Sequence, residues 1–153
     1  MPAEPLVHLR PATAEDLPAL KLCARAAYAR YVPVIGREPA PMVADFARPI
    51  ADGSVCVATC DAGLAGFILF YPQDDAMLLE NVAVHPVFAG HGIGGRLIAL
   101  CEDKARELGL GRVRLYTNAA MAANLTLYPR LGYRVTGRRT EDGFDRVYFE
   151  KPV

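Results

Sequence analysis

The stretch from Leu78 to Leu97, LLENVAVHPVFAGHGIGGRL, most constrains the fold of this chain. An apolar strand pattern runs through Val84 into a turn with glycines at positions 90, 92, 94 and 95, and helical spacing of apolar residues follows directly. The first turn of a helix leaves about four N–H groups unpaired and carries roughly half a positive charge. Because glycines have no Cβ, an anion can approach such a backbone closely. The stretch therefore predicts an anion cradle between a strand and a helix.

Two nucleotide-binding motifs contain similar glycines, and the sequence disfavours both. Gly90, Gly92 and Gly95 have the spacing of the dinucleotide-binding motif G-x-G-x-x-G. That motif needs an acidic residue about 20 positions further on and a long doubly wound sheet. No Asp or Glu lies between Glu107 and Glu141, and only 58 residues follow Gly95. No Gly-Lys-Ser/Thr follows the glycines, which excludes a nucleoside triphosphate loop.

The pattern of apolar residues and turns over the whole chain predicts an α/β fold with a mixed sheet. The 153 residues are expected to form a single domain, 1–153, with its core at about 6–150. A loop is expected at 32–41, which contains three prolines and a glycine. Strands are predicted at 7–10, 55–60, 64–71, 77–84, 112–117, 133–139 and 144–150, and helices at 13–31, 41–51, 93–108 and 119–131.

Charge and composition argue against several classes of partner. Basic and acidic side chains number 17 each, so no net charge attracts nucleic acid or a membrane surface. The longest apolar run, 64–71, is much shorter than the ~20 residues that span a bilayer, and the first residues do not resemble a signal peptide. A cytoplasmic protein is expected. The four cysteines lack the spacing of a metal site, so free thiols and no metal are predicted.

Residues 89–94, Ala-Gly-His-Gly-Ile-Gly, resemble the coenzyme A cradle of the GNAT acetyltransferase superfamily, [Gln/Arg]-x-x-Gly-x-[Gly/Ala]. Ala89 departs from the usual Gln or Arg, but both glycines are kept. Residues 124–133, NLTLYPRLGY, look like the helix-then-strand segment of the family that ends LYxxLGY. Two motifs in the family order imply a single-domain GNAT-like fold, in which about four helices accompany a mixed, mostly antiparallel sheet of about seven strands.

The resemblance implies an N-acetyltransferase. Such an enzyme transfers the acetyl group of acetyl-CoA to a primary amine of a small molecule or peptide, by direct attack in a ternary complex and without a metal. Two alternatives remain open: a non-catalytic CoA-binding or regulatory module on the same fold, and a transferase of a longer acyl group. Family members are often dimers, so a homodimer is one expectation. The sequence leaves the identity of the acceptor open.

The resemblance also assigns roles to individual residues. Tyr128 is the candidate acid that protonates the departing thiolate, with a packing tyrosine as the alternative. Glu80 is the candidate base for the amine, and the alternative is an ion pair with a neighbouring arginine such as Arg114. Asn124 either faces the pantetheine arm or holds its helix. The CoA-binding residues implied are Val82, Ala83, Val84, Ala89, Gly90, His91, Gly92, Ile93, Gly94, Gly95, Arg96, Asn124 and Tyr128.

The acceptor side is less constrained by the sequence. The loop after the first predicted helix supplies Tyr31, Arg37 and Glu38, which are candidate contacts for a polar substrate because this region varies with the acceptor in the family. The alternative is a solvated turn. Pro129 lies inside the helix that carries Tyr128, where a proline removes one hydrogen bond and favours a kink.

Overall fold

The computed structural model describes residues 6–153 of the chain. The described residues form seven strands and five α-helices, with short 3-10 turns between some of them. The strands are β1 (His8–Pro11), β2 (Val55–Cys60), β3 (Gly63–Gln73), β4 (Ala76–Val84), β5 (Arg112–Asn118), β6 (Arg134–Glu141) and β7 (Phe144–Pro152). The helices are α1 (Leu17–Tyr28), α2 (Val32–Ile35), α3 (Ala47–Ala51), α4 (Ile93–Glu107) and α5 (Ala122–Arg130).

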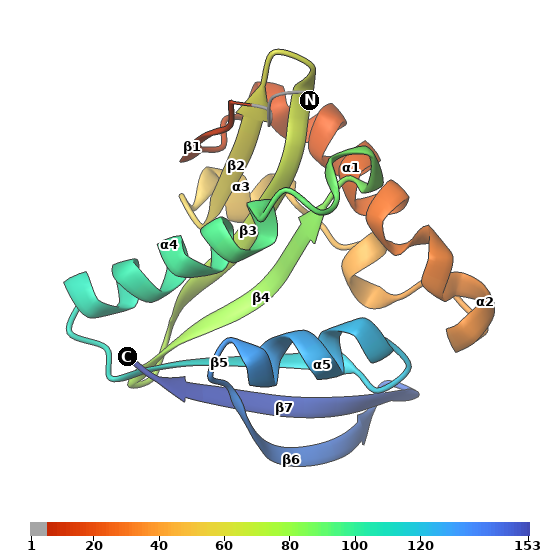
Figure 1. Ribbon diagram of the computed structural model, residues 1–153, viewed down its shortest axis with the longest axis vertical. Helices are drawn as coiled ribbons and strands as arrows, with labels where there is room; N and C mark the ends of the chain where they lie inside the picture. The colour runs from red at the N-terminus through yellow and green to blue at the C-terminus, as the bar shows by residue number, and fades with distance from the viewer. Residues whose placement is uncertain (1–5) are drawn as a thin grey trace. The chain divides into compact units, whose positions relative to one another are not determined.

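The strands form one sheet of order β1-β2-β3-β4-β5-β7-β6 (Figure 1). Strands β4 and β5 pair in parallel, whereas β1–β2, β2–β3, β5–β7 and β6–β7 are antiparallel. This confirms the predicted α/β fold with a mixed, mostly antiparallel sheet of seven strands. The described chain divides into two compact units. Unit 1 contains the residues up to Phe70 together with Asn81–Leu100, and unit 2 contains Tyr71–Glu80 together with Cys101–Val153.

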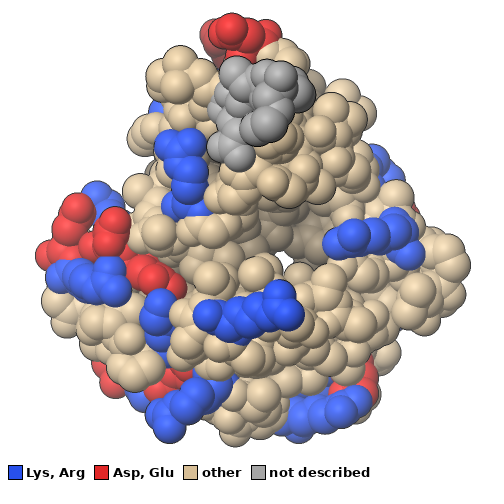
Figure 2. All heavy atoms as spheres, in the orientation of Figure 1, with Lys and Arg blue, Asp and Glu red and all other residues tan. Residues whose placement is uncertain are grey.

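Helix α4 is amphipathic, as its sequence predicts. Ile93, Leu97 and Cys101 on its apolar face are at most 2% exposed. The solvated face near its C-terminus carries opposite charges three residues apart, in the pairs Arg106–Asp103 at 2.8 Å and Lys104–Glu107 at 3.2 Å. Figure 2 shows these red and blue side chains intermixed at the left of the view. Because exposed pairs of this kind contribute little stability, the buried apolar face is what fixes the helix.

The core of unit 1 forms between the strands β2 and β3 and the early helices. Val57 and Phe67, on facing strands, are fully buried, and so is Leu20 of α1. Phe46, just before α3, packs edge-on against Phe67 with ring centroids 5.3 Å apart. Val55 and Val57 are buried in β2, and so is Ala58, next to the register shift between Ala58 and Thr59.

Gly66 of β3 permits a close approach of β4 and α4 to this strand. A Cβ atom at this position would lie 2.8 Å from the carbonyl oxygen of Ala83 and 3.4 Å from Leu97 Cδ1. No real side chain tolerates the first of these distances without a backbone shift. Gly66 therefore lets the end of β4 and the first turns of α4 lie directly against β3. The sequence analysis did not identify this residue.

The short helices differ from the sequence prediction. The loop expected at 32–41 contains α2, which has Pro33 in its first turn, where a proline is tolerated, and ends at Gly36 with φ +88°. The helix expected at 41–51 is a 3-10 turn at Ala40–Met42 followed by α3. Asp45 accepts a hydrogen bond from the Ala47 amide at 3.0 Å, so the start of α3 is set by this local contact.

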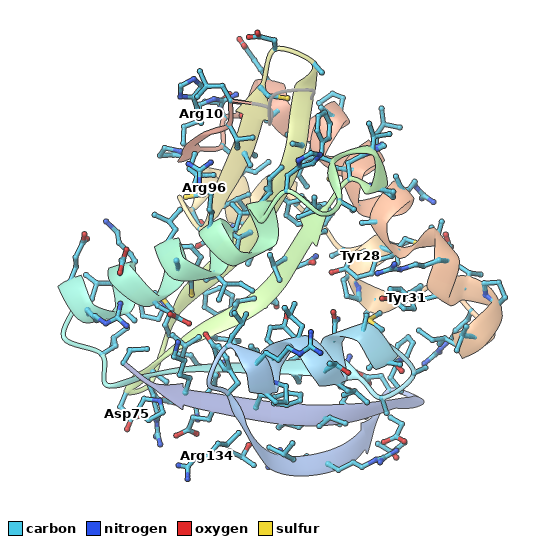
Figure 3. All side chains as sticks on the ribbon, viewed as in Figure 1. Arg10, Tyr28, Tyr31, Asp75, Arg96 and Arg134 are labelled. Atoms are coloured by element: carbon cyan, nitrogen blue, oxygen red, sulfur yellow. The ribbon has the colours of Figure 1, made fainter. Side chains whose placement is uncertain are left out.

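A stability prediction concerns the entry to α1. Asp16 accepts two hydrogen bonds from Arg10 at 2.8 Å and one from the Thr13 amide at 2.7 Å (Arg10 is labelled in Figure 3). The Arg10 guanidinium, more than the opposing effect of burial, lowers the pKa of Asp16 from 3.8 to about 2. A carboxylate with a depressed pKa in the folded state stabilises the protein above its unfolded pKa, and that contribution is lost as the pH falls through the folded pKa.

We therefore expect Asp16→Asn to lower the free energy of unfolding at pH 5, with a difference from the wild type that shrinks between about pH 4 and pH 2. Urea unfolding at a series of pH values measures this difference. Arg10→Met should remove the same pH-dependent contribution, because it removes the group that lowers the pKa of Asp16. A difference that stays constant down to pH 2 would contradict the prediction.

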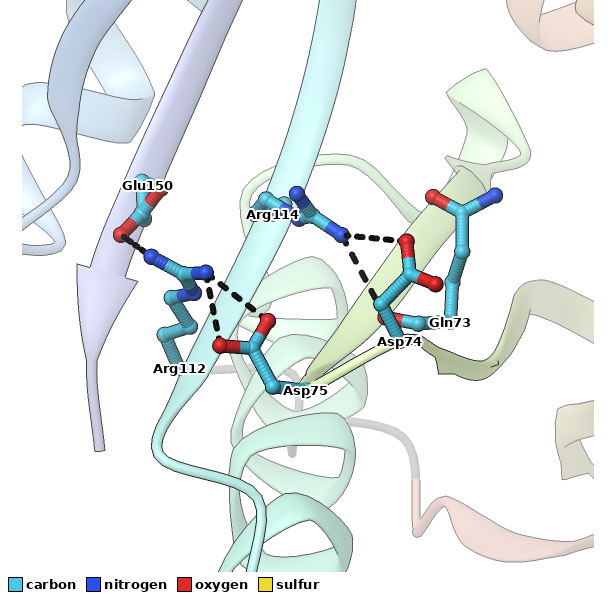
Figure 4. A network of polar contacts seen from close by, with 6 residues as sticks. All are labelled: Gln73, Asp74, Asp75, Arg112, Arg114 and Glu150. Atoms are coloured by element: carbon cyan, nitrogen blue, oxygen red, sulfur yellow. Dashed lines mark hydrogen bonds and ion pairs between the residues drawn. The ribbon is translucent and has the colours of Figure 1, made fainter.

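Unit 2 is built on β5, β7 and β6. Arg112 of β5 donates two hydrogen bonds to Asp75 at 2.8 and 2.9 Å and one to Glu150 of β7 at 3.1 Å (Figure 4). Arg114 donates to the carbonyl oxygen of Gln73 at 3.3 Å. These contacts connect the turn between β3 and β4 to β5 and β7. They also assign Arg114 a structural role at this turn.

Candidate functional site

The turn that leads from β4 into α4 presents its backbone. Gly90 and Gly92 have φ values of +85° and +73°, in the left-handed region that favours glycine. The amide of Ala89 donates to the carbonyl oxygen of Pro86 at 3.1 Å, and the next amide with an acceptor among the described residues is that of Arg96, which donates to Gly92 at 3.1 Å. Among the described residues, the amides of residues 90–95 have no hydrogen-bond acceptor. Six consecutive N–H groups therefore remain for a ligand at the positive end of a 15-residue helix.

The space in front of these amides suits a bulky anion. A Cβ atom at Gly90, Gly92 or Gly95 would meet nothing within 4 Å, so no described side chain fills the turn. His91 and Arg96 are exposed at its border, and Arg96 also donates to the carbonyl oxygen of Val7 at 3.2 Å (Figure 3). We call residues 89–96 the cradle. Its geometry fits the diphosphate of a nucleotide-like group such as CoA.

The end of β4 leads to the cradle with two amides on one edge. The amide of His85 donates to Ala65 of β3 at 2.8 Å. Because successive residues of a strand point to opposite edges, the amides of Val82 and Val84 face away from β3. Val82 and Val84 are half-buried, and Ala83 between them is 7% exposed. Both amides therefore point to the edge where an extended ligand arm could pair with the strand.

Tyr28 of α1 contacts this edge of β4, and the sequence analysis missed it as a site residue. Its hydroxyl oxygen lies 2.7 Å from Asn81 Oδ1 and 3.0 Å from the carbonyl oxygen of Val82. The amide of Asn81 donates in turn to the carbonyl oxygen of Pro41 at 3.3 Å. From the sequence alone, a tyrosine at the end of an amphipathic helix is expected to be a packing residue. Only the folded structure places Tyr28 beside this edge of β4.

The three residues expected on the acceptor side lie in different environments of unit 1. Tyr31 is 8% exposed, and its ring lies 6.5 Å from that of Tyr28 (both are labelled in Figure 3). Glu38 is exposed and accepts a hydrogen bond from Arg25 at 3.2 Å. Arg37 is exposed. Of the three, Tyr31 is the one that lies beside Tyr28, whose hydroxyl contacts β4.

Glu80 lies on the half-exposed face of β4 in unit 2. Its Oε1 accepts a hydrogen bond from the hydroxyl of Tyr71, on the adjacent strand β3, at 3.3 Å. Burial, together with the negative charge of Glu80, raises the pKa of Tyr71 to about 12. Tyr71 thus remains a hydrogen-bond donor at physiological pH and orients the carboxylate. Arg114 contacts Gln73 and Asp74 instead, so the partner of Glu80 in this unit is a tyrosine rather than this arginine.

Helix α5 carries the two remaining predicted residues. Tyr128 is 4% exposed, and its ring packs against Tyr133 and Phe149 with centroids 5.7 and 5.6 Å apart. Asn124 donates to Thr117 Oγ1 of β5 at 3.0 Å, so its amide group holds α5 to the sheet. Pro129 lies in the last turn of α5, where its missing N–H leaves only the carbonyl group of Leu125 without its usual partner.

Within residues 6–153, no group of three or more His, Cys, Asp or Glu side chains is arranged to hold a metal ion. None of the helices in the described part of the chain has both the length and the apolar character that crossing a bilayer requires.

The curated relatives that this chain matches are named as acetyltransferases. The chain is 32% identical over 90 residues to the streptothricin acetyltransferase of Streptomyces lavendulae, covering 57% of this chain and 48% of that protein. It spans between 30% and 50% of the length of the curated relatives it matches. A crystal structure of nourseothricin acetyltransferase is 30% identical, with a TM-score of 0.60 over 64% of both chains.

A structure that matches over almost the whole chain shows the fold. The PaiA N-acetyltransferase of Thermoplasma acidophilum, solved in complex with coenzyme A, has a TM-score of 0.77 and 19% identity, and the match covers 97% of this chain and 99% of that one. The model of the acetyltransferase (GNAT) family matches residues 23–133, which include the end of β4, the cradle and all of α5. With this match over more than half of its length, the chain belongs to the GNAT family of acetyltransferases.

Proposed function

We propose that this protein is an acetyl-CoA-dependent N-acetyltransferase, in which residues 1–153 act as one domain. Its acceptor would be a primary amine of a small molecule or peptide that attacks acetyl-CoA directly in a ternary complex. The observation that carries the proposal is the row of six amides at residues 90–95 with no acceptor among the described residues. Membership in the GNAT family supports the acetyl transfer.

In this proposal, unit 1 binds and orients the acyl donor. The amides of residues 90–95 and the N-terminal dipole of α4 hold the diphosphate of CoA, and Arg96 adds a positive charge beside it. The amides of Val82 and Val84 donate to the pantetheine arm and to the thioester carbonyl oxygen. Oriented donors at a developing oxyanion are commonly worth about 3–4 kcal/mol. Bound acetyl-CoA supplies an acetyl thioester that is activated toward amines and has a thiolate as its leaving group.

In this proposal, two side chains of unit 2 accept and donate the protons of the reaction. Glu80, oriented by Tyr71, accepts the proton that the amine loses, directly or through water. Tyr128 gives its phenolic proton to the sulfur that leaves, because a phenol with a pKa near 10 is well matched to a thiolate with a pKa of about 8–9. The proton balance closes when Glu80 releases its proton to solvent and the phenolate regains one.

The test is to incubate the protein with acetyl-CoA and a panel of primary amines while free thiol is measured, and to identify acetylated products by mass spectrometry. We expect thiol release that depends on the amine and equals the amount of product. Reactions without amine control for hydrolysis. CoA binding without amine-dependent thiol release would favour a non-catalytic CoA-binding module. Calorimetry that stays flat on titration with acetyl-CoA would refute the proposal altogether.

A further inference from the structure

A cluster of aromatic and charged side chains lies on one face of unit 2, and the sequence analysis did not identify it. On β5 and β7, Tyr116 faces Tyr148 in the register, and Arg146 lies two positions from Tyr148. All three are half-buried, whereas Val147, between Arg146 and Tyr148, and Phe149, directly after Tyr148, are buried. Phe149 packs against Tyr128 of α5. The cluster therefore lies on the face of the sheet opposite to α5.

Glu80 shares this face. The parallel pairing of β4 and β5 sets Leu78 beside Arg114, and both are half-buried. Two positions further along each strand, Glu80 and Tyr116 follow on the same face because the side-chain period of a strand is two. The electrostatic surroundings of Tyr116 agree. Burial raises the pKa of its hydroxyl, the positive charge of Arg146 opposes this rise and the negative charge of Glu80 adds to it. The charges of Glu80 and Arg146 therefore both act on the hydroxyl of Tyr116.

Arg146 is held between aromatic rings. Its Cζ atom lies 4.6 Å from the ring centroid of Tyr116 and 5.6 Å from that of Phe144, and its side chain is only 13% exposed. A guanidinium group that stacks on rings keeps its plane fixed, while its N–H groups point outward along its edges. The orientation of these donors is therefore set before any ligand arrives.

The N–H groups of Arg146 lack a hydrogen-bond acceptor among the described residues. The nearest carboxylate oxygens, Glu141 Oε1 and Asp142 Oδ2, lie 3.9 and 4.0 Å from its Nη1 atom. Both distances exceed a hydrogen bond. Glu141 Oε1 instead accepts a hydrogen bond from the hydroxyl of Tyr148.

Two other arginines of the same sheet hold carboxylates at hydrogen-bond distance, although the Nε atom of Arg112 is buried without a partner among the described residues. Arg138 of β6 donates two hydrogen bonds to Asp145 at 2.6 and 3.1 Å. Arg112 of β5 makes the paired contact with Asp75 described above. Arg146 is less exposed than either of them. A largely buried guanidinium group gains most from a ligand that satisfies its donors, and a planar carboxylate matches two of them at once.

We propose that the acceptor of this enzyme is an amino acid or a similar amine that carries a carboxylate, which Arg146 binds through paired hydrogen bonds while Glu80 serves the amine. This inference rests on the proposed acetyltransferase function and names the substrate class of that function. In this proposal, the amine of the bound acceptor lies beside Tyr71 and Tyr116, and its carboxylate lies beside Phe144 and Tyr148. Arg146 is thus a specificity residue, and it takes no part in the proton transfers.

A diamine is the rival acceptor, since three carboxylates, Glu80, Glu141 and Asp142, surround Tyr116. Each carboxylate could attract an ammonium group. The donors of Arg146 favour the amino acid, because a diamine would offer them no acceptor and would place another cation beside the guanidinium group.

The experiment compares amino acids with the amines that they form on loss of the carboxylate. The pairs are tyrosine and tyramine, histidine and histamine, lysine and cadaverine, and alanine and ethylamine. For the acetylated amino acids we expect kcat/KM to exceed that of the matched amine by about 10- to 100-fold, the range for hydrogen bonds to a charged group. Calorimetry with CoA present, where no transfer occurs, should show the same preference in binding.

Variants assign the preference to Arg146. In Arg146→Met, the ratio of kcat/KM between amino acid and matched amine should fall toward one, and Arg146→Lys should give an intermediate ratio, because a lysine keeps the charge but cannot pair in plane. Arg139→Met is the control, since Arg139 faces Arg146 in the register and stacks on Tyr148 at 4.9 Å but is exposed. A merely structural role of Arg146 would lower both rates and leave the ratio unchanged.

The outcomes separate this inference from the function on which it rests. Equal rates within the pairs, faster acetylation of the amines that lack a carboxylate, or an unchanged ratio in Arg146→Met would overturn the substrate class and leave the acetyltransferase intact. Failure to acetylate any amine, with either class of acceptor, would overturn both. The comparison of acceptors with the wild-type protein requires no variant, so a poorly folding Arg146→Met protein does not prevent the test.

Discussion

Gly92→Val is expected to weaken acetyl-CoA binding by about 100-fold or more, because several amide contacts to a diphosphate would be lost together. Gly92 has φ +73°, and no described atom lies within 4 Å of the place where its Cβ would stand. A valine would fill the space in front of the amides of the cradle. It would also resist the left-handed backbone that directs these amides outward. Titration calorimetry with acetyl-CoA measures the change directly.

The chain offers a matched control for the strain of this substitution. Gly53, in the turn before β2, has φ +76° and is equally open, but it lies outside the cradle. Gly53→Val and Gly92→Val should therefore lower the free energy of unfolding by similar amounts, of the order of 1–3 kcal/mol. Only Gly92→Val should lose affinity for acetyl-CoA. Equal affinities in both variants would remove the cradle from the binding site.

Tyr128→Phe is expected to lower kcat for acetyl transfer by about 100-fold, the lower end of the range for general acid catalysis. The affinity for acetyl-CoA should change little, because the ring of Tyr128 still packs against Tyr133 and Phe149 after loss of the hydroxyl. Steady-state rates with a saturating acceptor, combined with calorimetry, separate the two effects. Wild-type turnover in this variant would show that Tyr128 has only a packing role.

Tyr133 is the matched control, because it lies ring to ring with Tyr128 in the same buried layer. Its hydroxyl donates to the buried Glu102 at 2.9 Å, and Lys151 also contacts this carboxylate at 3.1 Å. Tyr133→Phe should therefore cost stability, about 1–3 kcal/mol for the partly unsatisfied carboxylate, and leave kcat unchanged. An equal loss of kcat in both variants would indicate a general effect of disturbing this layer.

The sequence predicted the strands well, since their signals are local. Val55–Cys60 has the predicted bounds, and the remaining strands differ from prediction by at most two residues at either end. Alternating apolar residues and the turns at Asp61-Ala62-Gly63 and Glu141-Asp142-Gly143 were sufficient. Helix starts were less predictable. Asn118 accepts a hydrogen bond from the Ala120 amide at 2.9 Å, so α5 begins at Ala122 although the helical pattern starts at 119.

The cradle was predictable for the same reason as the strands, whereas the rest of the candidate site was not. The glycines of the cradle act on their own backbone, within one continuous stretch of sequence. The neighbours of Glu80 come from other strands. Tyr71 lies on β3, and Arg146 reaches Tyr116 only because β7 inserts between β5 and β6. No pattern within a single segment reports that strand order.

Gly66 shows how a residue remote from any ligand can govern donor binding. A methyl group there would meet the carbonyl oxygen of Ala83, a backbone atom that cannot rotate away. Relief would require β3 to separate from the end of β4 and from Leu97, and the opening turn of α4 would move with them. Mutant libraries aimed at a different acyl donor should therefore keep position 66 invariant, even though nothing bound to the protein need ever touch it.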